Sequence, residues 1–385
     1  MAEPIDPVTF LEGLAAELAE IHRGKHFAQW RPDAVQRTDS ALEQAEPFRA
    51  YAATRIFAGD GMTSQFEGRL GNWAVDRLVD KLSPSAILEA FHAEVARNNA
   101  VYEEVSPAIG IAIEQETELE NGVRLVPPSA SILDIEGYSH RYRWGMLPEG
   151  TGFLVQSYRV TPAFAPATQD SLDEDAVVTE PDRATRDAVR ERFRRACLLV
   201  SPGGVELPVS VIAADRHSLF QVDGNSASRP HAARPHTAMP VDTGALRSVY
   251  ASLAQVDDRD IVERAIDRLG RSRLSLDPVD RALDLGMAAE IVLMHDAGQS
   301  NAEITYKISS RAAWLVASEA GERAEIFDRM RDLYAARSKA VHTGRLPAKK
   351  PVDLDAADSL VTRVIRAIVE RGGFPDWKRL ALGDG

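Results

Sequence analysis

The chain lacks the residues on which several protein classes depend. Its 385 residues include one cysteine, Cys197, which excludes a disulfide framework and any zinc or iron–sulfur site built from cysteines. No apolar run approaches the roughly 20 residues of a membrane-spanning helix. The first residues, Met1 to Asp6, are acidic and lack the basic-then-apolar pattern of a secretory signal. We therefore expect a cytoplasmic protein with no membrane partner.

The common sequence signatures of catalysis are also missing. The sequence contains no glycine-rich phosphate loop, no His-Glu-x-x-His, no Gly-x-Ser-x-Gly and no EF-hand loop. These absences disfavour ATPases, kinases, dehydrogenases, zinc proteases and α/β-hydrolases. His231 and His236 lie among prolines with no carboxylate nearby, so we expect no metal site there and no bound cofactor.

Basic residues are outnumbered by acidic ones. The chain has 45 Lys and Arg against 58 Asp and Glu, a net charge of −13. Such a chain does not coat nucleic acid non-specifically, so any role with nucleic acid would need a local site. Of the basic residues, 38 are arginines, whose planar guanidinium suits phosphate. A codon bias toward arginine explains most of these positions without any role in phosphate binding. Composition alone therefore does not indicate a function.

Hydrophobic periodicity predicts an α+β protein of several domains. In residues 1–105, apolar residues recur every three or four positions, which predicts a helical N-terminal region. Residues 106–225 form a mixed α+β domain, because Ile109, Ile111 and Ile113 alternate with small residues and Asn121-Gly122 is a typical hairpin turn. Further expected features of this domain are strands at 152–158 and 207–213, an acidic loop at 162–181 and a helix at 185–199.

The last part of the chain is predicted to be a helical bundle. Residues 226–242 are rich in Pro, Ala, Ser and Arg, which indicates a linker or surface loop. Residues 243–385 are helical with short connections, a pattern typical of an antiparallel bundle. Asp277-Pro278 is a typical helix start and Gly344 a typical residue just past a helix end. The expected helices cover 244–255, 260–269, 277–295, 301–317, 321–342 and 354–370.

One group of polar residues stands out at the end of the helix expected at 321–342. Arg337, Ser338, Lys339 and His342 lie in its last turns, just before Gly344. From Arg331 to Lys350 there are six basic residues and one acidic residue, a net charge of +5. An arginine–histidine spacing alone carries little information in so arginine-rich a chain. The position of this group at the end of a helix in the predicted bundle makes it a candidate site. A favourable interaction with the helix dipole would explain Arg337 and His342 equally well.

The sequence around this group resembles a known family. Arg337-Ser338-Lys-Ala-Val-His342 is similar to the Arg-polar-x3-His element of the HEPN superfamily, in the ApeA-like branch of prokaryotic defence proteins. The stretches 282–290 and 303–315 resemble the same branch in their order and spacing. The resemblance therefore covers the C-terminal helical domain. The mixed domain fits ApeA-like proteins loosely, and we find no counterpart for the helical N-terminus.

The resemblance implies metal-independent cleavage of RNA by a homodimer. A ribose 2′-hydroxyl attacks the adjacent phosphorus, and the transition state needs a proton carrier and a cation. His342 suits the first role because imidazole titrates near neutrality, and Arg337 suits the second because guanidinium forms paired hydrogen bonds with phosphate. Five residues rotate about 140° along a helix, so we expect a site completed across a two-fold axis of the bundle. A toxin-like or antiviral role follows from the resemblance alone, and an antitoxin or regulatory partner is left open.

Five further residues are candidates for a supporting role. Ser338 and Lys339 lie beside the catalytic candidates, and Ser338 would orient either group or the phosphate. Glu290 and Arg311, mid-helix among apolar residues, form either a buried pair that fixes the register of the bundle or part of an RNA groove. Tyr334, one turn before Arg337, either stacks on a base or packs in the core.

Two other functions remain open. A non-catalytic HEPN domain would serve as a dimerisation or RNA-binding module. A regulator that binds phosphate or a nucleotide is the other possibility. RNA cleavage in the presence of EDTA would distinguish the enzyme from both.

Overall fold

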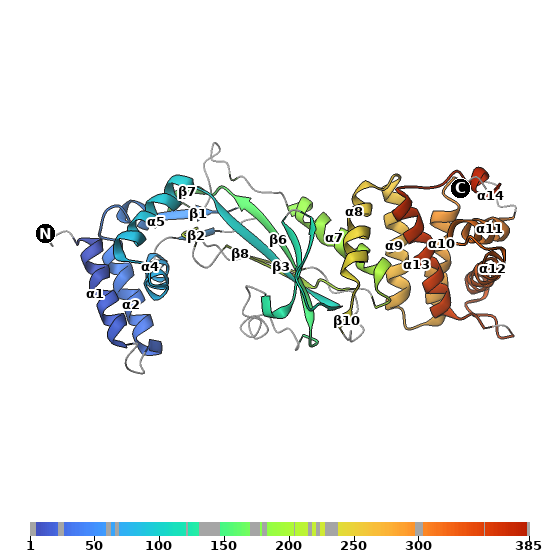
Figure 1. The fold of residues 1–385 in the computed structure, drawn as a ribbon, viewed down its shortest axis with the longest axis horizontal. Coiled ribbons are helices and arrows are strands. Elements are labelled where there is room, and N and C mark those ends of the chain that lie inside the picture. The colour runs from blue at the N-terminus through green and yellow to red at the C-terminus, as the bar shows by residue number, and fades with distance from the viewer. Residues whose placement is uncertain are drawn as a thin grey trace. The chain divides into compact units, whose positions relative to one another are not determined.

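The structure is a computed structural model, shown as a ribbon in Figure 1. It contains both helices and β-sheets, with helices toward the C-terminus, so the predicted α+β class is confirmed. None of the helices among the described residues is long and apolar enough to cross a lipid bilayer. The described residues are 5–21, 27–58, 63–65, 69–120, 122–130, 147–169, 178, 183–203, 205–214, 218–220, 224–227, 238–296, 303–349 and 351–382.

The chain forms two compact units, each assembled from three separate stretches. Unit 1 comprises Met1–Val105, Gln156–Arg186 and Val209–Ala227. Unit 2 comprises Ser106–Val155, Asp187–Pro208 and Ser228–Gly385. The division into the four consecutive segments 1–105, 106–225, 226–242 and 243–385 stays a prediction.

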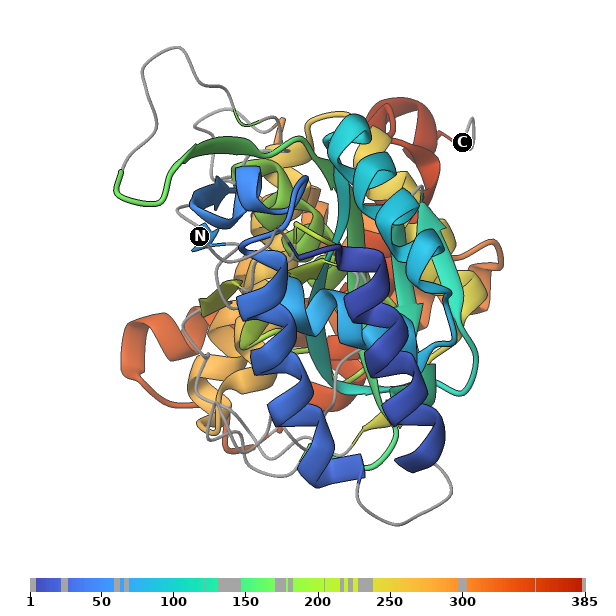
Figure 2. The ribbon, with the colours of Figure 1, turned by 90° about the vertical axis from the view of Figure 1, so that its left-hand side faces the viewer.

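Unit 1 combines helices with a small antiparallel sheet of order β2-β1-β7. Figure 2 shows α1 and α2 side by side, in blue. Buried residues of α1, α2, α4, α5 and β1, among them Leu11, Trp73 and Phe91, share one core. The elements are α1 (Pro7–Ile21), α2 (Phe27–Leu42), α3 (Arg49–Ala52), α4 (Leu70–Val79), α5 (Pro84–Arg97), β1 (Thr54–Phe57), β2 (Thr63–Gln65) and β7 (Ala163–Pro166).

Two sequence predictions are wrong in this unit. Ile56 and Phe57 were expected to continue a helical pattern, but they lie in β1. The first residues of the segment expected to be an acidic loop form β7, which pairs with β1 through Phe57 and Ala163, whereas the acidic residues of that segment lie outside the described residues. A strand pairing between segments so distant in sequence leaves no trace in local periodicity, which is why the sequence did not reveal it.

A larger sheet has the strand order β4-β5-β6-β3-β8-β9, and β10 pairs with β3. An antiparallel pairing of β4 with β5, with Thr117 opposite Leu125, is present on either side of the predicted turn, of which Asn121 lies outside the described residues. The strands and the helix predicted for the mixed domain are also present. Their bounds are β3 (Ala100–Ala112), β4 (Thr117–Glu120), β5 (Val123–Val126), β6 (Thr151–Val160), β8 (Val209–Ala214), β9 (Gly224–Ala227), β10 (Met239–Pro240) and α7 (Arg183–Val200), with a 3₁₀ turn at Pro128–Ala130.

Most helices of unit 2 begin and end close to the predicted residues, but α9 continues to Leu274, five residues beyond its predicted end, and α14 was not predicted. Asp277 accepts a hydrogen bond of 2.8 Å from Val279 N at the start of α10, and Gly344 ends α12 with a left-handed φ of 63°. Helices α10, α11 and α12 contact one another, and α10 also contacts α9 and α13. The bounds are α8 (Thr243–Gln255), α9 (Arg259–Leu274), α10 (Pro278–Leu293), α11 (Ile304–Val316), α12 (Ala320–Thr343), α13 (Leu354–Arg371) and α14 (Trp377–Ala381).

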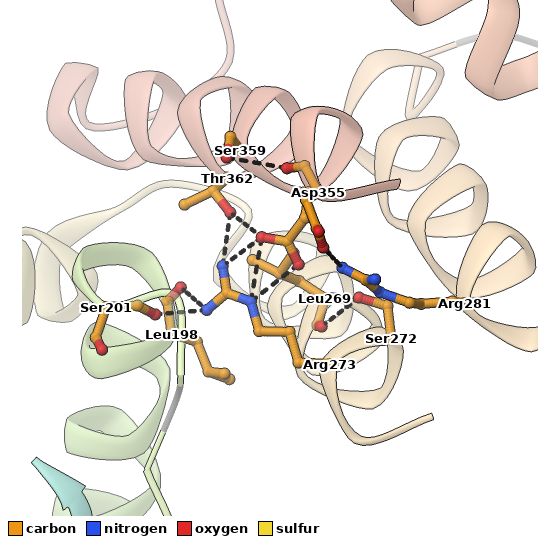
Figure 3. A network of polar contacts seen from close by, with 10 residues as sticks. Leu198, Ser201, Leu269, Ser272, Arg273, Arg281, Asp355, Ser359 and Thr362 are labelled. Carbon is orange, nitrogen blue, oxygen red and sulfur yellow. Dashed lines mark hydrogen bonds and ion pairs between the residues drawn. The ribbon is translucent and has the colours of Figure 1, made fainter. Parts of the chain in front are cut away.

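The buried side chain of Arg273 connects α9, α13 and the end of α7 (Figure 3). Arg273 of α9 donates from Nε and Nη2 to the Asp358 carboxylate of α13, and from Nη2 to Thr362 Oγ1 at 2.9 Å. Its Nη1 donates to the Leu198 and Ser201 carbonyls at the end of α7, both at 2.7 Å. All five N–H groups of the guanidinium are therefore bonded, which offsets the cost of burying the charge.

Candidate functional site

Arg337 lies on α12 and packs against α10. A Cβ atom added at Gly286 of α10 would lie 2.5 Å from Arg337 Cγ and 2.6 Å from Arg337 Cβ. Only glycine leaves room for this approach, which explains a residue of low helix propensity in the middle of a helix. The side chain of Arg337 therefore packs closely against α10 at Gly286.

The guanidinium of Arg337 is held by an ion pair. Its Nη2 is 3.0 Å from Glu290 Oε2, one turn of α10 beyond Gly286, and the two side chains are 25% and 32% exposed. Arg337 Nε is buried and has no hydrogen-bond partner among the described residues. Glu290 Oε2 likewise has no hydrogen-bond partner among the described residues, so the two side chains are joined by an ion pair and part of their hydrogen-bonding capacity is unused.

Tyr334 completes this cluster. The Arg337 guanidinium carbon lies 5.5 Å from the centre of the Tyr334 ring, within range of a cation–π interaction. Burial raises the pKa of the Tyr334 hydroxyl, and the nearby Glu290 carboxylate raises it further. Tyr334 is therefore a neutral hydroxyl at physiological pH. Because the residue is buried, packing in the core is confirmed for it.

His342 lies apart from this cluster, in the last turn of α12. Its side chain is exposed, and within the described part of the chain no hydrogen bond, ion pair or ring contact joins it to Arg337. Ser338 is half-buried and Lys339 exposed. Arg337 thus faces α10 while His342 faces solvent, as the helical rotation between them requires. One chain does not bring the two catalytic candidates together.

The pairing of Glu290 with Arg311, one of the two alternatives that the sequence left open, does not occur, and their place in an RNA groove stays a prediction. Glu290 pairs with Arg337 instead, and Arg311 Nη1 lies 2.6 Å from both Asp296 Oδ1 and the Leu293 carbonyl at the end of α10. Arg311 also lies 4.8 Å from the ring centre of Trp377. The sequence suggested a pair of Glu290 with Arg311 because both residues are mid-helix among apolar residues. It could not tell which of several arginines faces the carboxylate.

The electrostatics of Asp296 agree with a structural role for Arg311. Burial by itself raises the pKa of Asp296, and the hydrogen bonds and charge of Arg311 outweigh that effect, so the pKa is lowered. Arg311 therefore ties α11 to the end of α10 and to Trp377 of α14. The residue that sequence reasoning missed is Gly286, whose signal was a glycine among strong helix formers.

No group of three or more His, Cys, Asp or Glu side chains suited to a metal ion occurs among the described residues. The His231 and His236 positions lie outside the described residues. Cys197 is buried, and burial raises its thiol pKa strongly, so the thiolate that reacts with electrophiles or metals is suppressed.

The comparisons with known proteins supply no relative. No family model, no curated protein and no solved structure matches this chain.

Proposed function

We propose that this protein is a metal-independent RNA endonuclease of the HEPN type, acting in the cytoplasm as a homodimer. Its C-terminal helices would form the HEPN-like bundle. Support comes from the resemblance of residues 282–290, 303–315 and 337–342 to the ApeA-like branch, together with the contacts among α10, α11 and α12 that carry these stretches. The toxin-like or antiviral role rests on the resemblance alone.

One observation carries the proposal most directly. Arg337 contacts Gly286, Glu290 and Tyr334, and the first two belong to the stretch 282–290 that resembles the family. A guanidinium held in one orientation needs little reorganisation when it receives the negative charge of a five-coordinate phosphorus. The Glu290 carboxylate acts as a positioning group, because it aligns the guanidinium without touching the RNA.

The proton transfers fall to His342. As the base, it accepts the 2′-hydroxyl proton while that oxygen attacks phosphorus; as the acid, an imidazolium gives a proton to the departing 5′-oxygen. The products are a 2′,3′-cyclic phosphate and a 5′-hydroxyl.

A dimer explains how the separated residues act together. Because Arg337 and His342 point in different directions from one helix, a single copy would give an incomplete site. A two-fold axis beside the end of α12 would place His342 of one protomer near Arg337 of the other.

A second function is supported by a different observation. The ion pair between Arg337 and Glu290 is complete within one chain and contributes to the α10–α12 contact. A non-catalytic bundle that serves as a dimerisation or RNA-binding module would keep the same pair for packing alone.

The substitution His342→Ala distinguishes the proposed endonuclease from the non-catalytic module. We expect it to abolish cleavage of tRNA or mRNA in EDTA, while the melting temperature stays close to that of wild type, because the side chain is exposed. The control is His92→Ala, an exposed histidine on α5, which should cleave as wild type does. Cleavage is followed by gel electrophoresis and the product ends by mass spectrometry. Wild-type activity in His342→Ala, or a strict requirement for Mg²⁺ or Zn²⁺, would contradict the proposed enzyme.

A further inference from the structure

A strip of exposed positive charge begins at the C-terminal end of α12. It consists of Lys339, Arg345 and Lys349, which we call the basic strip. Among the residues that the structure describes, none of these three side chains has an ion-pair or hydrogen-bond partner. No Asp or Glu occurs between Leu333 and Pro351. The strip therefore carries its full charge in a protein of net charge −13.

Two other basic residues on these helices are paired with carboxylates. Arg331 pairs with Asp328 at 2.9 Å, and Arg363 of α13 pairs with Glu322 at 2.6 Å. Of the six basic residues from Arg331 to Lys350, the strip supplies three, Arg337 is paired with Glu290, and Lys350 lies outside the described residues. This contrast within one region indicates that the strip serves something other than internal pairing.

The turn after α12 orders the start of the strip. Gly344 N donates to the Ala340 carbonyl at 2.8 Å, and the Thr343 hydroxyl lies 2.8 Å from the Lys339 carbonyl. Leu346 and Pro347 are half-buried, so the loop turns its apolar residues inward and leaves Arg345 and Lys349 exposed on either side. Lys339 precedes His342 by three residues, which makes the two side chains neighbours on the helix surface.

The acidic residues that follow in the sequence are engaged elsewhere. Asp353 caps α13 by accepting from Asp355 N and Ala356 N, both at 3.0 Å. The Asp355 carboxylate pairs with Arg281 of α10 at 2.5 Å. The charge of Asp355 is therefore compensated by Arg281, and the carboxylate of Asp353 is held at the start of α13.

We propose that the basic strip binds the phosphate backbone of single-stranded RNA and leads the strand to His342. This inference rests on the proposed function and extends it to how the substrate is held. Lysine and arginine contacts with phosphates release counterions, so affinity falls as the salt concentration rises. For a single strand, each contact steepens the slope of log affinity against log salt concentration by about 0.7. Three contacts would contribute a slope of about 2. The simpler alternative is that the basic residues at the end of α12 only stabilise the helix through its dipole. In that case their removal would lower stability without weakening RNA binding.

The test measures binding separately from cleavage. A short, fluorescein-labelled 2′-O-methyl RNA lacks the attacking hydroxyl, so it stays intact and its anisotropy reports binding alone. The variant K339Q/R345Q/K349Q removes the strip. The matched control, R247Q/R271Q/K378Q, makes the same charge change at exposed residues of unit 2 elsewhere. Both are titrated in EDTA at about 50 to 200 mM KCl, and their melting temperatures are compared.

We expect the strip variant to bind at least tenfold more weakly than the control, with a salt slope smaller by about 2. The charge-conserving variant K339R/K349R should bind as wild type does, which excludes misfolding as the cause. Equal affinities and slopes for strip and control variants would overturn the proposal, and so would absence of binding by wild type. Equally tight binding of duplex DNA would overturn the assignment to single-stranded RNA. If the strip binds but wild type cuts no RNA, the proposed enzyme fails while the strip stands.

Discussion

At the scale of single residues, Gly286 is the position on which the Arg337 site depends most. A Cβ atom there would lie 2.5 and 2.6 Å from carbons of Arg337 that are close to the α12 backbone. These atoms cannot swing away as a flexible side-chain end would, so α10 and α12 would have to move apart. We expect Gly286→Ala to lower the free energy of unfolding by about 1–3 kcal/mol, measured by chemical denaturation.

Gly321 provides the control for this prediction. It lies in the first turn of α12, and an added Cβ would have no atom within 4 Å. Gly321→Ala should therefore be neutral or stabilise the protein by about 0.4–1 kcal/mol, because alanine has fewer unfolded conformations to lose. If Gly286→Ala behaves like Gly321→Ala, the close approach of Arg337 to α10 is incorrect.

At the scale of secondary-structure elements, Arg273 holds three helices together. Arg273→Leu would leave the Asp358 carboxylate buried without its partner and free the two carbonyls at the end of α7. We expect a loss of about 3–5 kcal/mol in the free energy of unfolding, since an unpaired buried charge is costly. The double variant Arg273→Leu/Asp358→Leu should recover part of this loss because no charge then stays buried.

An exposed pair on α13 serves as the comparison. Arg366 Nε lies 2.7 Å from Glu370 one turn away, and both side chains are partly exposed. Arg366→Leu should cost about 0.3–0.5 kcal/mol, as is usual for such surface pairs. A cost for Arg273→Leu no larger than this would show that the buried network contributes little.

The elements also show what a sequence can and cannot predict. Helix boundaries were predictable because their signals are local: Asp277 caps the helix it precedes, and Gly344 adopts the positive φ that ends another. Strand β1 was not, because its four residues are too few to show a period of two and one of its partners, β7, is distant in sequence. The Arg337 site was predicted in part. Its helix and its residue types follow from the sequence, whereas the choice of Arg337 over Arg311 as the partner of Glu290 depends on which turn of α10 each side chain reaches.

At the scale of the whole molecule, the helices after residue 243 share their core with earlier parts of unit 2. Phe193 and Leu198 of α7 are buried in the same cluster as Leu269 and Val361. Leu198 packs close to Gly270, and a Cβ there would lie 3.0 Å from its side chain. The Tyr250 hydroxyl of α8 lies 2.6 Å from Arg192 and 2.9 Å from Glu120. A domain consisting of residues 243–385 alone would lose all these contacts.

This sharing leads to a prediction about the domain boundary that the sequence suggests. A fragment of residues 243–385 would expose the apolar faces of α8 and α9 that α7 and β4 cover, and would leave the Arg273 guanidinium without two of its acceptors. We expect the fragment to bind the dye ANS and to melt well below the full chain, or to aggregate, because exposed apolar patches of this kind drive association. Size-exclusion chromatography, dye fluorescence and thermal melts of fragment and full chain provide the measurement. If the fragment is a dye-free species that melts with the full chain, the bundle is an independent domain and the contacts with α7 contribute nothing to its stability.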